Sequence, residues 1–515
     1  PHHVTIKLDE ENSFNRVERD VALARCFEAG GHLRSLGRCA AAELTSKARV
    51  VMDGRVLPFR SENGGRQGMP TFPSVHAIAT LPECRAADAR VARHGGHARF
   101  FFDDGYITGP VREAVLAALA YGEDIQANRN GVLRLDKCEA YCPTLGSALL
   151  DHPAIQDLVE WRTAADGRQV RTIKGIRVAS AGLEVVGCPV GTTDFVTSAA
   201  EAAVDKMCNT TTTVQDALSS TSRHALHSLT QYCLAPRADY LAANVYPDLA
   251  RPALERFDAA ISQCSLAAMG GAGPLIESDT FASRRWRLPV RSRGLGIRRR
   301  VDVAPAAFVG TVSAVVPHML DRTPAIGGTV PGFCNVLAST LGAGSFDDSR
   351  RANRFATLAA DAASPLGTAF TRAWDALRAE VAGATTAASP PPDDGPLSAA
   401  VQAAGIDPAT NAPYSRLQHA ITAQREELRV KSLDADLRQL GARDPRCASF
   451  LCSDRLSTAA FNAWPSRDWS FSNSDFPEVV ANYLGLPSPA CAPFVGRAVS
   501  GQSGVVDAHG HTLLT

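Results

Sequence analysis

The sequence lacks any apolar run that approaches the roughly eighteen residues of a membrane-spanning helix, and no secretory signal opens it. It also lacks a net charge, because 53 basic and 53 acidic side chains balance at pH 7. We therefore expect a nuclear or cytoplasmic protein with no membrane partner. A neutral chain gives no overall indication of a nucleic-acid partner, so the local distribution of charge has to decide that question.

A zinc-finger pattern is missing as well. The thirteen cysteines have no repeating spacing, and the closest pairs are Cys138 with Cys142 and Cys447 with Cys452. Neither pair has two intervening residues, and no histidines follow at finger spacing. Reduced thiols in the core are therefore favoured over zinc ligands. With 515 residues, 45% of them hydrophobic, the chain is long and apolar enough for two to four globular domains.

One stretch, from Ala98 to Pro110, places two adjacent aspartates between apolar residues. Apolar residues lead to Asp103 and Asp104, Gly105 follows, and apolar residues resume. The Asp-Gly pair predicts a hairpin turn between two strands. Adjacent carboxylates at a hairpin tip repel each other, and a divalent cation would neutralise them. Taken alone, the same residues fit a solvated turn.

Four other blocks accompany this stretch. Alternating apolar and polar residues from Val4 to Leu8 predict a half-buried strand that ends at Asp9. A glycine-rich turn occupies residues 61–70. Residues 131–139 and 182–191 each suggest a strand with a turn.

In chain order, these five blocks resemble the palm of reverse transcriptases, particularly those of non-LTR retroelements. The matching patterns are Asp-x-x-x-x-Phe from Asp9, Gln-Gly-x-Pro from Gln67, aromatic-x-Asp-Asp, Leu-x-x-x-Lys-Cys from Leu133, and a final strand turn. The likeness is sharpest over residues 4–195 and looser to about residue 330. It implies an RNA-directed DNA polymerase that uses an RNA template, a DNA primer and deoxynucleoside triphosphates.

The resemblance also implies an α+β architecture. We expect a palm, with an antiparallel sheet covered by helices on one face, over residues 1–195. In the family, fingers precede the palm, whereas Pro1 lies only eight residues before Asp9, so we expect a palm and thumb without fingers. The remaining expected regions are a helical thumb at 196–330, a helical extension at 331–381, a linker at 382–398 and a mostly helical C-terminal module with its tail at 399–515.

For the active site, the resemblance implies that Asp9, Asp103 and Asp104 are catalytic and hold two Mg²⁺ ions, with Mn²⁺ as a substitute. Two such ions can activate a 3′ oxygen and stabilise departing pyrophosphate. The alternative is three unrelated surface aspartates. A second functional class also stays open: a captured reverse-transcriptase fold acting as a non-catalytic scaffold or nucleic-acid-binding protein.

The resemblance assigns substrate contacts to four residues. Phe14 would lie under the sugar and clash with a 2′-hydroxyl, Gln67 and Gly68 would lie along template and nucleotide, and Lys137 would assist pyrophosphate departure. Met69 departs from the polar residue often found at its position. The alternatives are a core aromatic for Phe14 and an ordinary exposed lysine for Lys137.

The only plainly basic segment spans residues 284–300, with eight arginines in seventeen residues. We expect a loop with short strands there. It either contacts nucleic-acid phosphates or pairs with acidic neighbours. The nucleic-acid-binding candidates in this segment are Arg284, Arg285, Arg287, Arg298, Arg299 and Arg300.

Hydrophobic periodicity and turn residues predict further elements. A hairpin is expected at residues 47–60 around Asp53-Gly54. Helices are expected at 16–53, with a stop at Gly30-Gly31, and at 73–92, 111–127, 199–217, 220–234, 302–322, 350–382 and 418–440.

Overall fold

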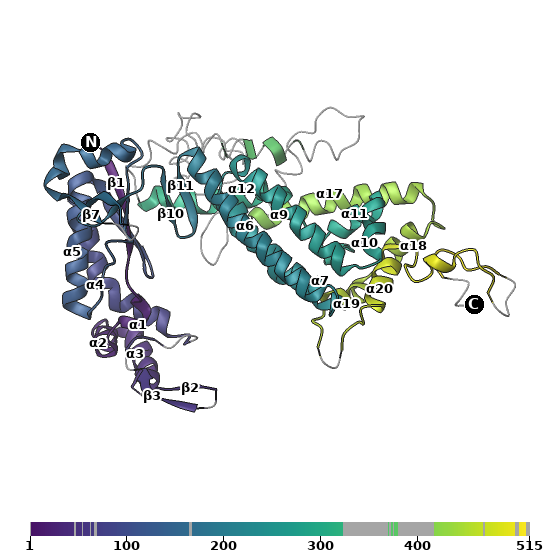
Figure 1. Cartoon of the computed structure of the whole chain (residues 1–515), viewed down its shortest axis with the longest axis horizontal. Helices are drawn as coiled ribbons and strands as arrows, with labels where there is room; N and C mark the ends of the chain where they lie inside the picture. The colour runs from purple at the N-terminus through teal and green to yellow at the C-terminus, as the bar shows by residue number, and fades with distance from the viewer. Residues whose placement is uncertain are drawn as a thin grey trace. The chain divides into compact units, whose positions relative to one another are not determined.

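The computed structural model describes residues 2–45, 48–53, 55–61, 63–65, 69–163, 167–322, a few positions between 369 and 379, and residues 417–466, 469–499 and 504–510. The chain divides into two compact units, Pro1–Val196 and Thr197–Thr515. Figure 1 shows the elements of each unit. The predicted linker at 382–398, and the predicted helix at 350–382 apart from those few positions, lie outside the described residues.

The first unit is built on a five-stranded sheet with the order β4-β5-β1-β6-β9. Every neighbouring pair is antiparallel except β6 and β9, which run parallel. The expected antiparallel sheet is therefore present in three of the four strand pairs, and the expectation was wrong at the β6–β9 edge. There the chain crosses over between β6 and β9 instead of turning back directly. The strands are β1 (His3–Asp9), β4 (His97–Phe101), β5 (Asp104–Pro110), β6 (Glu139–Tyr141) and β9 (Arg177–Val178).

Two long helices pack on one face of this sheet. The helices α4 (Phe72–Ala92) and α5 (Val111–Arg129) share a core with the buried side chains Val4, Ile6 and Leu8 of β1. The alternate residues of β1, including Asp9, point to the opposite face, as the period of two requires. The predicted helices at 73–92 and 111–127 and the predicted strand ending at Asp9 are confirmed.

The residues between β1 and α4 form three helices and a hairpin. These are α1 (Ser13–Arg16), α2 (Arg19–Glu28), α3 (Gly31–Leu44), β2 (Ala48–Met52) and β3 (Arg55–Ser61). The predicted stop at Gly30 is confirmed, since its φ of 69° lies in the left-handed region. Helix does not continue to residue 53, because the hairpin strand β2 begins at Ala48. The predicted hairpin at 47–60 is present in β2 and β3.

Two further hairpins complete the first unit. The strand β7 (Val159–Thr163) pairs with β8 (Gln169–Ile173), and β10 (Gly182–Val185) pairs with β11 (Cys188–Gly191). The backbone N–H of Val186, in the turn between β10 and β11, donates to the Tyr106 hydroxyl of β5 at 2.8 Å. This contact attaches the turn to the central sheet. Two 3₁₀ helices, Gly146–Asp151 and Pro153–Leu158, precede β7.

The described part of the second unit is helical. Its core includes Phe257, Trp286 and Phe308. The predicted helices at 302–322 and 418–440 correspond to α12 (Arg300–Arg322) and α17 (Leu417–Gln439). The predicted helix at 199–217 lies inside α6 (Thr193–Leu218), and the one at 220–234 divides into α7 (Arg223–Leu229) and a π-helical turn. None of the described helices has the length and apolar character needed to span a membrane. The elements are α6 (Thr193–Leu218), α7 (Arg223–Leu229), the π turn Thr230–Leu234, the 3₁₀ helix Ala235–Ala238, α8 (Asp239–Asn244), α9 (Pro247–Ala268), α10 (Ala272–Ser278), α11 (Thr280–Arg287), the 3₁₀ helix Val290–Ser292, α12 (Arg300–Arg322), α17 (Leu417–Gln439), α18 (Pro445–Cys452), α19 (Arg455–Asn462), α20 (Asp475–Leu484) and the 3₁₀ helix Ala492–Phe494.

Candidate active site

The three predicted catalytic aspartates gather at one end of the central sheet. Asp9, the last residue of β1, pairs across the sheet with Asp104, the first residue of β5. Directly opposite residues of an antiparallel pair direct their side chains to the same face, with Cβ atoms roughly 5 Å apart. Asp103 immediately precedes Asp104 in the turn between β4 and β5. The fold therefore brings three carboxylates from two segments of the chain close together.

The hairpin that carries two of these carboxylates differs from the predicted turn. Phe101 pairs with Asp104, so the two turn residues are Phe102 and Asp103, and the left-handed φ of 57° belongs to Phe102. Gly105 lies within β5 instead. A Cβ atom at Gly105 would come within 2.8 Å of the Phe100 ring, so close packing is what requires glycine there. An aromatic residue in the left-handed region is strained, and such strain is common at functional turns.

The electrostatics of this end of the sheet favour a cation. Burial raises the pKa of the Asp104 carboxyl, and the negative charges of Asp103, Asp9 and Glu184 raise it further, against an opposing effect of Lys7. A pKa raised by neighbouring carboxylates marks a place where negative charge is crowded. A divalent cation bound there would relieve this repulsion.

The backbone of Asp9 is held by the loop that precedes β6. The Asp9 carbonyl accepts a hydrogen bond of 2.8 Å from the Arg134 backbone N–H, and the Asp9 N–H donates to the Cys138 sulfur at 3.4 Å. Burial is the main cause that raises the pKa of Cys138 to about 12, so the sulfur stays a neutral thiol. Lys137 is exposed in the same loop. Its predicted role in pyrophosphate release stays a prediction.

Arg134 was missed by the sequence interpretation. Its guanidinium forms an ion pair of 2.7 Å with Asp136, in the loop that contacts the Asp9 backbone. It occupies a variable position of the Leu-x-x-x-Lys-Cys pattern, so the pattern gave no signal for it.

Phe14 lies next to the hairpin that carries Asp103. This half-buried residue of α1 has its ring centre 5.9 Å from that of Phe102. Its other neighbour is His76 of α4, whose ring stacks on it with a centroid separation of 4.3 Å. Met69 is buried in a core cluster with Phe72, which explains an apolar residue at that position. Gln67 and Gly68 lie outside the described residues.

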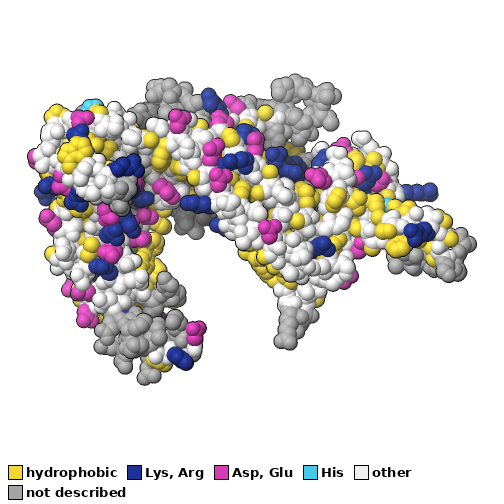
Figure 2. Space-filling view, in the orientation of Figure 1, with side chains coloured by type: hydrophobic (Ala, Val, Ile, Leu, Met, Phe, Trp, Pro, Cys, Tyr) yellow, Lys and Arg dark blue, Asp and Glu magenta, His cyan; other side chains and the backbone are white. Residues whose placement is uncertain are grey.

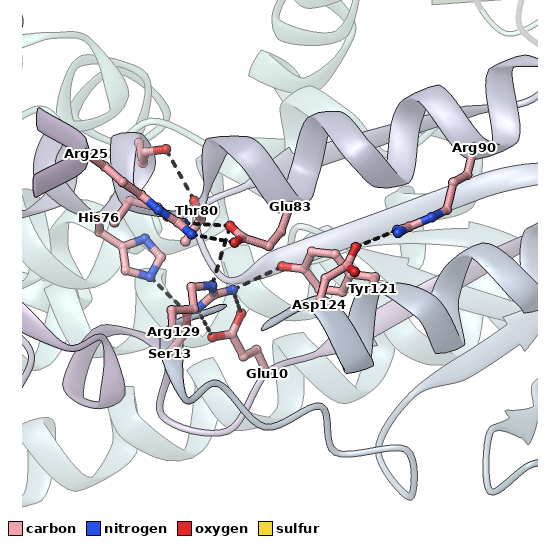
Figure 3. A network of polar contacts seen from close by, with 12 residues as sticks. Glu10, Ser13, Arg25, His76, Thr80, Glu83, Arg90, Tyr121, Asp124 and Arg129 are labelled. Atoms are coloured by element: carbon pink, nitrogen blue, oxygen red, sulfur yellow. Dashed lines mark hydrogen bonds and ion pairs between the residues drawn. The ribbon is translucent and has the colours of Figure 1, made fainter. Parts of the chain in front are cut away.

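A buried ionic network lies in the interior of the first unit (Figure 3). Glu10, the residue after Asp9, forms a bidentate ion pair with Arg129 at the end of α5. Arg129 also approaches Glu83 at 4.0 Å, and Glu83 pairs with Arg25 at 2.6 Å. The sequence interpretation missed all four residues, because charged side chains are usually solvated unless a partner from a distant segment pairs with them.

A magnesium ion at the aspartates would need further ligands from outside the protein. Among the residues that the structure describes, no group of three or more His, Cys, Asp or Glu side chains is arranged to hold a metal ion. Magnesium commonly takes only one or two carboxylates and completes its shell with water and substrate phosphates. Asp9, Asp104 and Asp103 carry oxygen atoms of this kind, and magnesium binding by them stays a prediction.

The basic segment at 284–300 has a different structure from the expected loop with short strands. Residues 284–287 belong to the helix α11, and Arg300 begins α12, with a 3₁₀ turn at Val290–Ser292 between them. The strand expectation was wrong because the run Leu288-Pro289-Val290 packs into a helical core, where Leu288 and Val290 are buried.

The arginines of this segment make many internal contacts. Arg284 pairs with Asp436 at 2.6 Å, Arg298 with Glu426 at 2.8 Å, Arg299 with Asp302 at 3.9 Å and Arg300 with Asp239 at 2.5 Å. Arg285 is buried, donates to Ser449 and Ser453 and lies 4.3 Å from the centre of the Tyr483 ring. Arg287 lies 5.4 Å from the centre of the Trp286 ring. These contacts match the alternative in which the segment pairs with its neighbours, and phosphate binding stays a prediction.

On the face drawn in Figure 2, Lys and Arg side chains are interspersed with Asp and Glu side chains. This pattern agrees with the equal numbers of basic and acidic residues. A large basic patch of the kind that indicates a nucleic-acid surface is not evident among the described residues on that face.

Comparison with known proteins does not assign the chain to a family: no protein-family model matches the sequence, and no curated protein matches it.

Proposed function

We propose that the first unit is the palm of a reverse-transcriptase-type polymerase, which extends a DNA primer on an RNA template with deoxynucleoside triphosphates. The observation that carries the proposal is the register of β1 and β5, in which Asp9 lies opposite Asp104 beside the hairpin residue Asp103. Aspartates from two strands at one end of a sheet, with crowded negative charge, are the ligands that such a reaction requires.

Each residue has a separate role under this proposal. Asp9, Asp103 and Asp104 would hold Mg²⁺, which when bound supplies activation of the attacking 3′ oxygen and stabilisation of the leaving pyrophosphate. Phe14 would orient the sugar of the incoming nucleotide. Because the pKa of Asp104 is raised by burial and by its acidic neighbours, protons compete with the metal at this carboxylate, and the competition increases as the pH falls.

The second candidate is a non-catalytic scaffold or nucleic-acid-binding protein with the same fold. One observation favours a non-catalytic role: no preassembled group of three metal-ligating side chains occurs among the described residues. The internal pairing of arginines in the basic segment favours the scaffold over the nucleic-acid-binding protein. The two candidates differ in one measurable property, which is template-directed primer extension.

The test is primer extension by the full chain with Mg²⁺ or Mn²⁺, comparing the wild type with Asp103→Asn. This substitution preserves the size of the side chain and removes its charge, so we expect extension to be lost while template binding and cooperative melting remain. Asp157→Asn is the matched control, because Asp157 is an exposed carboxylate of the same unit, and it should extend like the wild type.

A melting curve gives a second readout. Magnesium should raise the melting temperature of the wild type, because a ligand that binds only the folded state stabilises it, and this shift should vanish in Asp103→Asn. A folded wild type that binds primer-template but extends nothing with either metal would favour the scaffold. If Asp103→Asn extends the primer as well as the wild type does, the aspartates were assigned wrongly.

A further inference from the structure

His76 occupies a buried position where an apolar side chain would be expected. Its neighbours on the inner face of α4, Phe72, Val75 and Ala79, are buried apolar residues, and His76 itself is fully buried. One ring nitrogen, Nε2, forms a hydrogen bond of 2.8 Å with the Ser13 hydroxyl, whereas Nδ1 has no hydrogen-bond partner. A buried polar atom without a partner costs stability, which a phenylalanine at this position would avoid. This cost calls for a compensating role.

The orientation of the His76 ring suggests that role. It is nearly parallel to the ring of Phe14, with an interplanar angle of 4° and centres 4.3 Å apart. His76 also bonds to Ser13, the residue directly before Phe14. The same imidazole therefore stacks on the ring of Phe14 and is hydrogen-bonded to the side chain of the preceding residue. Figure 3 shows His76 and Ser13 directed toward each other from separate elements.

The other two aromatic neighbours of Phe14 do not stack on its ring. The rings of Phe72 and Phe102 lie 5.9 Å away at tilts of 59° and 44°, so neither stacks in parallel. Below α1, the Gly65 N–H donates to the Phe14 carbonyl at 3.0 Å, which holds the backbone but not the ring. Phe102 adjoins Asp103, so the supported ring stands beside the proposed catalytic carboxylates.

From this geometry we infer that His76 is a positioning residue that sets the preference of the enzyme for deoxynucleotides over ribonucleotides. The inference rests on the proposed polymerase function. A ring that discriminates against a 2′-hydroxyl has to resist displacement by it. The His76 ring, itself held by Ser13, stands behind Phe14 and opposes that displacement. The imidazole is neutral near pH 7, because burial foremost lowers the pKa of His76 to about 4, and a neutral ring stacks without a desolvated charge.

The experiment measures the ratio of kcat/KM for a deoxynucleotide to that for the matching ribonucleotide on one primer-template. A parallel aromatic contact changes such a ratio by about 2- to 12-fold. His76→Leu fills the core but lacks a flat ring, so its ratio should fall by that factor. His76→Phe restores the stack and should return the ratio toward the wild-type value. Phe14→Ala defines the largest loss.

Two controls separate positioning from loss of stability. Ser13→Ala removes only the hydrogen bond and should lower the ratio less than His76→Leu does. Val91→Ala truncates a fully buried residue near the C-terminal end of α4, so it should lower the melting temperature without changing the ratio.

An unchanged ratio in His76→Leu, together with a lowered ratio in Phe14→Ala, would overturn the inference and leave the polymerase intact. A fall in the ratio for Val91→Ala as large as that for His76→Leu would overturn it too, since general destabilisation would then explain both. A wild type that incorporates neither nucleotide would instead overturn the proposed function, and the inference with it.

Discussion

The Glu10 carboxylate forms a two-point ion pair with the Arg129 guanidinium, and the two side chains are only 4% and 0% exposed. Burial by itself would lower the pKa of Arg129, but hydrogen bonding and attraction to Glu10 outweigh it and raise that pKa. Glu10 directly follows Asp9, and Arg129 ends α5. The pair therefore joins the strand end that carries a proposed metal ligand to the helix beneath the sheet.

We expect Arg129→Met to lower the free energy of unfolding by about 3–5 kcal/mol, because it leaves the Glu10 carboxylate buried without its partner. Adding Glu10→Gln should recover part of this loss, since the uncompensated charge is removed. The matched control is Arg112→Met. It breaks the ion pair between Arg112 and Asp157, whose side chains are 38% and 59% exposed, so it should lower the free energy of unfolding much less than Arg129→Met does. Urea unfolding followed by circular dichroism measures all of these values. Equal losses at the two arginines would contradict the prediction.

Local patterns were sufficient for several elements of the fold. The alternation in β1 and the periodicity of α4, α5 and α17 lie within single segments, so the sequence carries the signal directly. The hairpin turn, in contrast, was predicted at the wrong residues. Asp104-Gly105 matches a preferred turn pair, but Gly105 is required in β5 by its packing on Leu8 and Phe100, and Leu8 belongs to a distant strand. Packing between distant segments overrides a local turn preference.

The residues of the candidate site likewise fall into those that the sequence could locate and those that it could not. The blocks around Asp9 and Asp103 could be located in the sequence, and the register of β1 with β5 brings them together. The Glu10–Arg129 pair joins residues 119 positions apart, so neither partner is recognisable as buried from its own segment. His76 was missed for the same reason, because its partners Ser13 and Phe14 lie on another helix.

A second prediction concerns the basic segment. We expect replacement of Arg298, Arg299 and Arg300 by alanine to lower the melting temperature and to leave the salt dependence of nucleic-acid binding unchanged. The reason is that the side chains of all three arginines already pair internally. Arg298 pairs with Glu426, Arg299 with Asp302 and Arg300 with Asp239. Binding measured as a function of salt concentration checks this result. A salt slope that falls by roughly one for each arginine removed would instead show that these side chains contact phosphates.

The last prediction concerns the pH dependence of stability, which His76 should control in part. Burial foremost lowers the pKa of His76 from 6.5 to about 4. Between these two pH values the unfolded chain binds a proton at this residue and the folded chain does not, so protons favour unfolding. Stability should therefore fall as the pH decreases from about 6.5 to about 4, by roughly 1.4 kcal/mol per pH unit and about 3 kcal/mol in total.

His76→Phe removes this proton-binding group. As the pH falls from about 6.5 to about 4, the unfolding free energy of the variant should therefore increase relative to that of the wild type. Comparing the two proteins at each pH cancels the contributions of the carboxylates and of His227, whose pKa burial also lowers, to about 3. His32→Phe, which removes an exposed histidine of the same unit, should run parallel to the wild type. If His76→Phe also runs parallel from pH 7 to pH 4, His76 must be protonated equally in both states. The neutral, buried imidazole that supports Phe14 would then be ruled out.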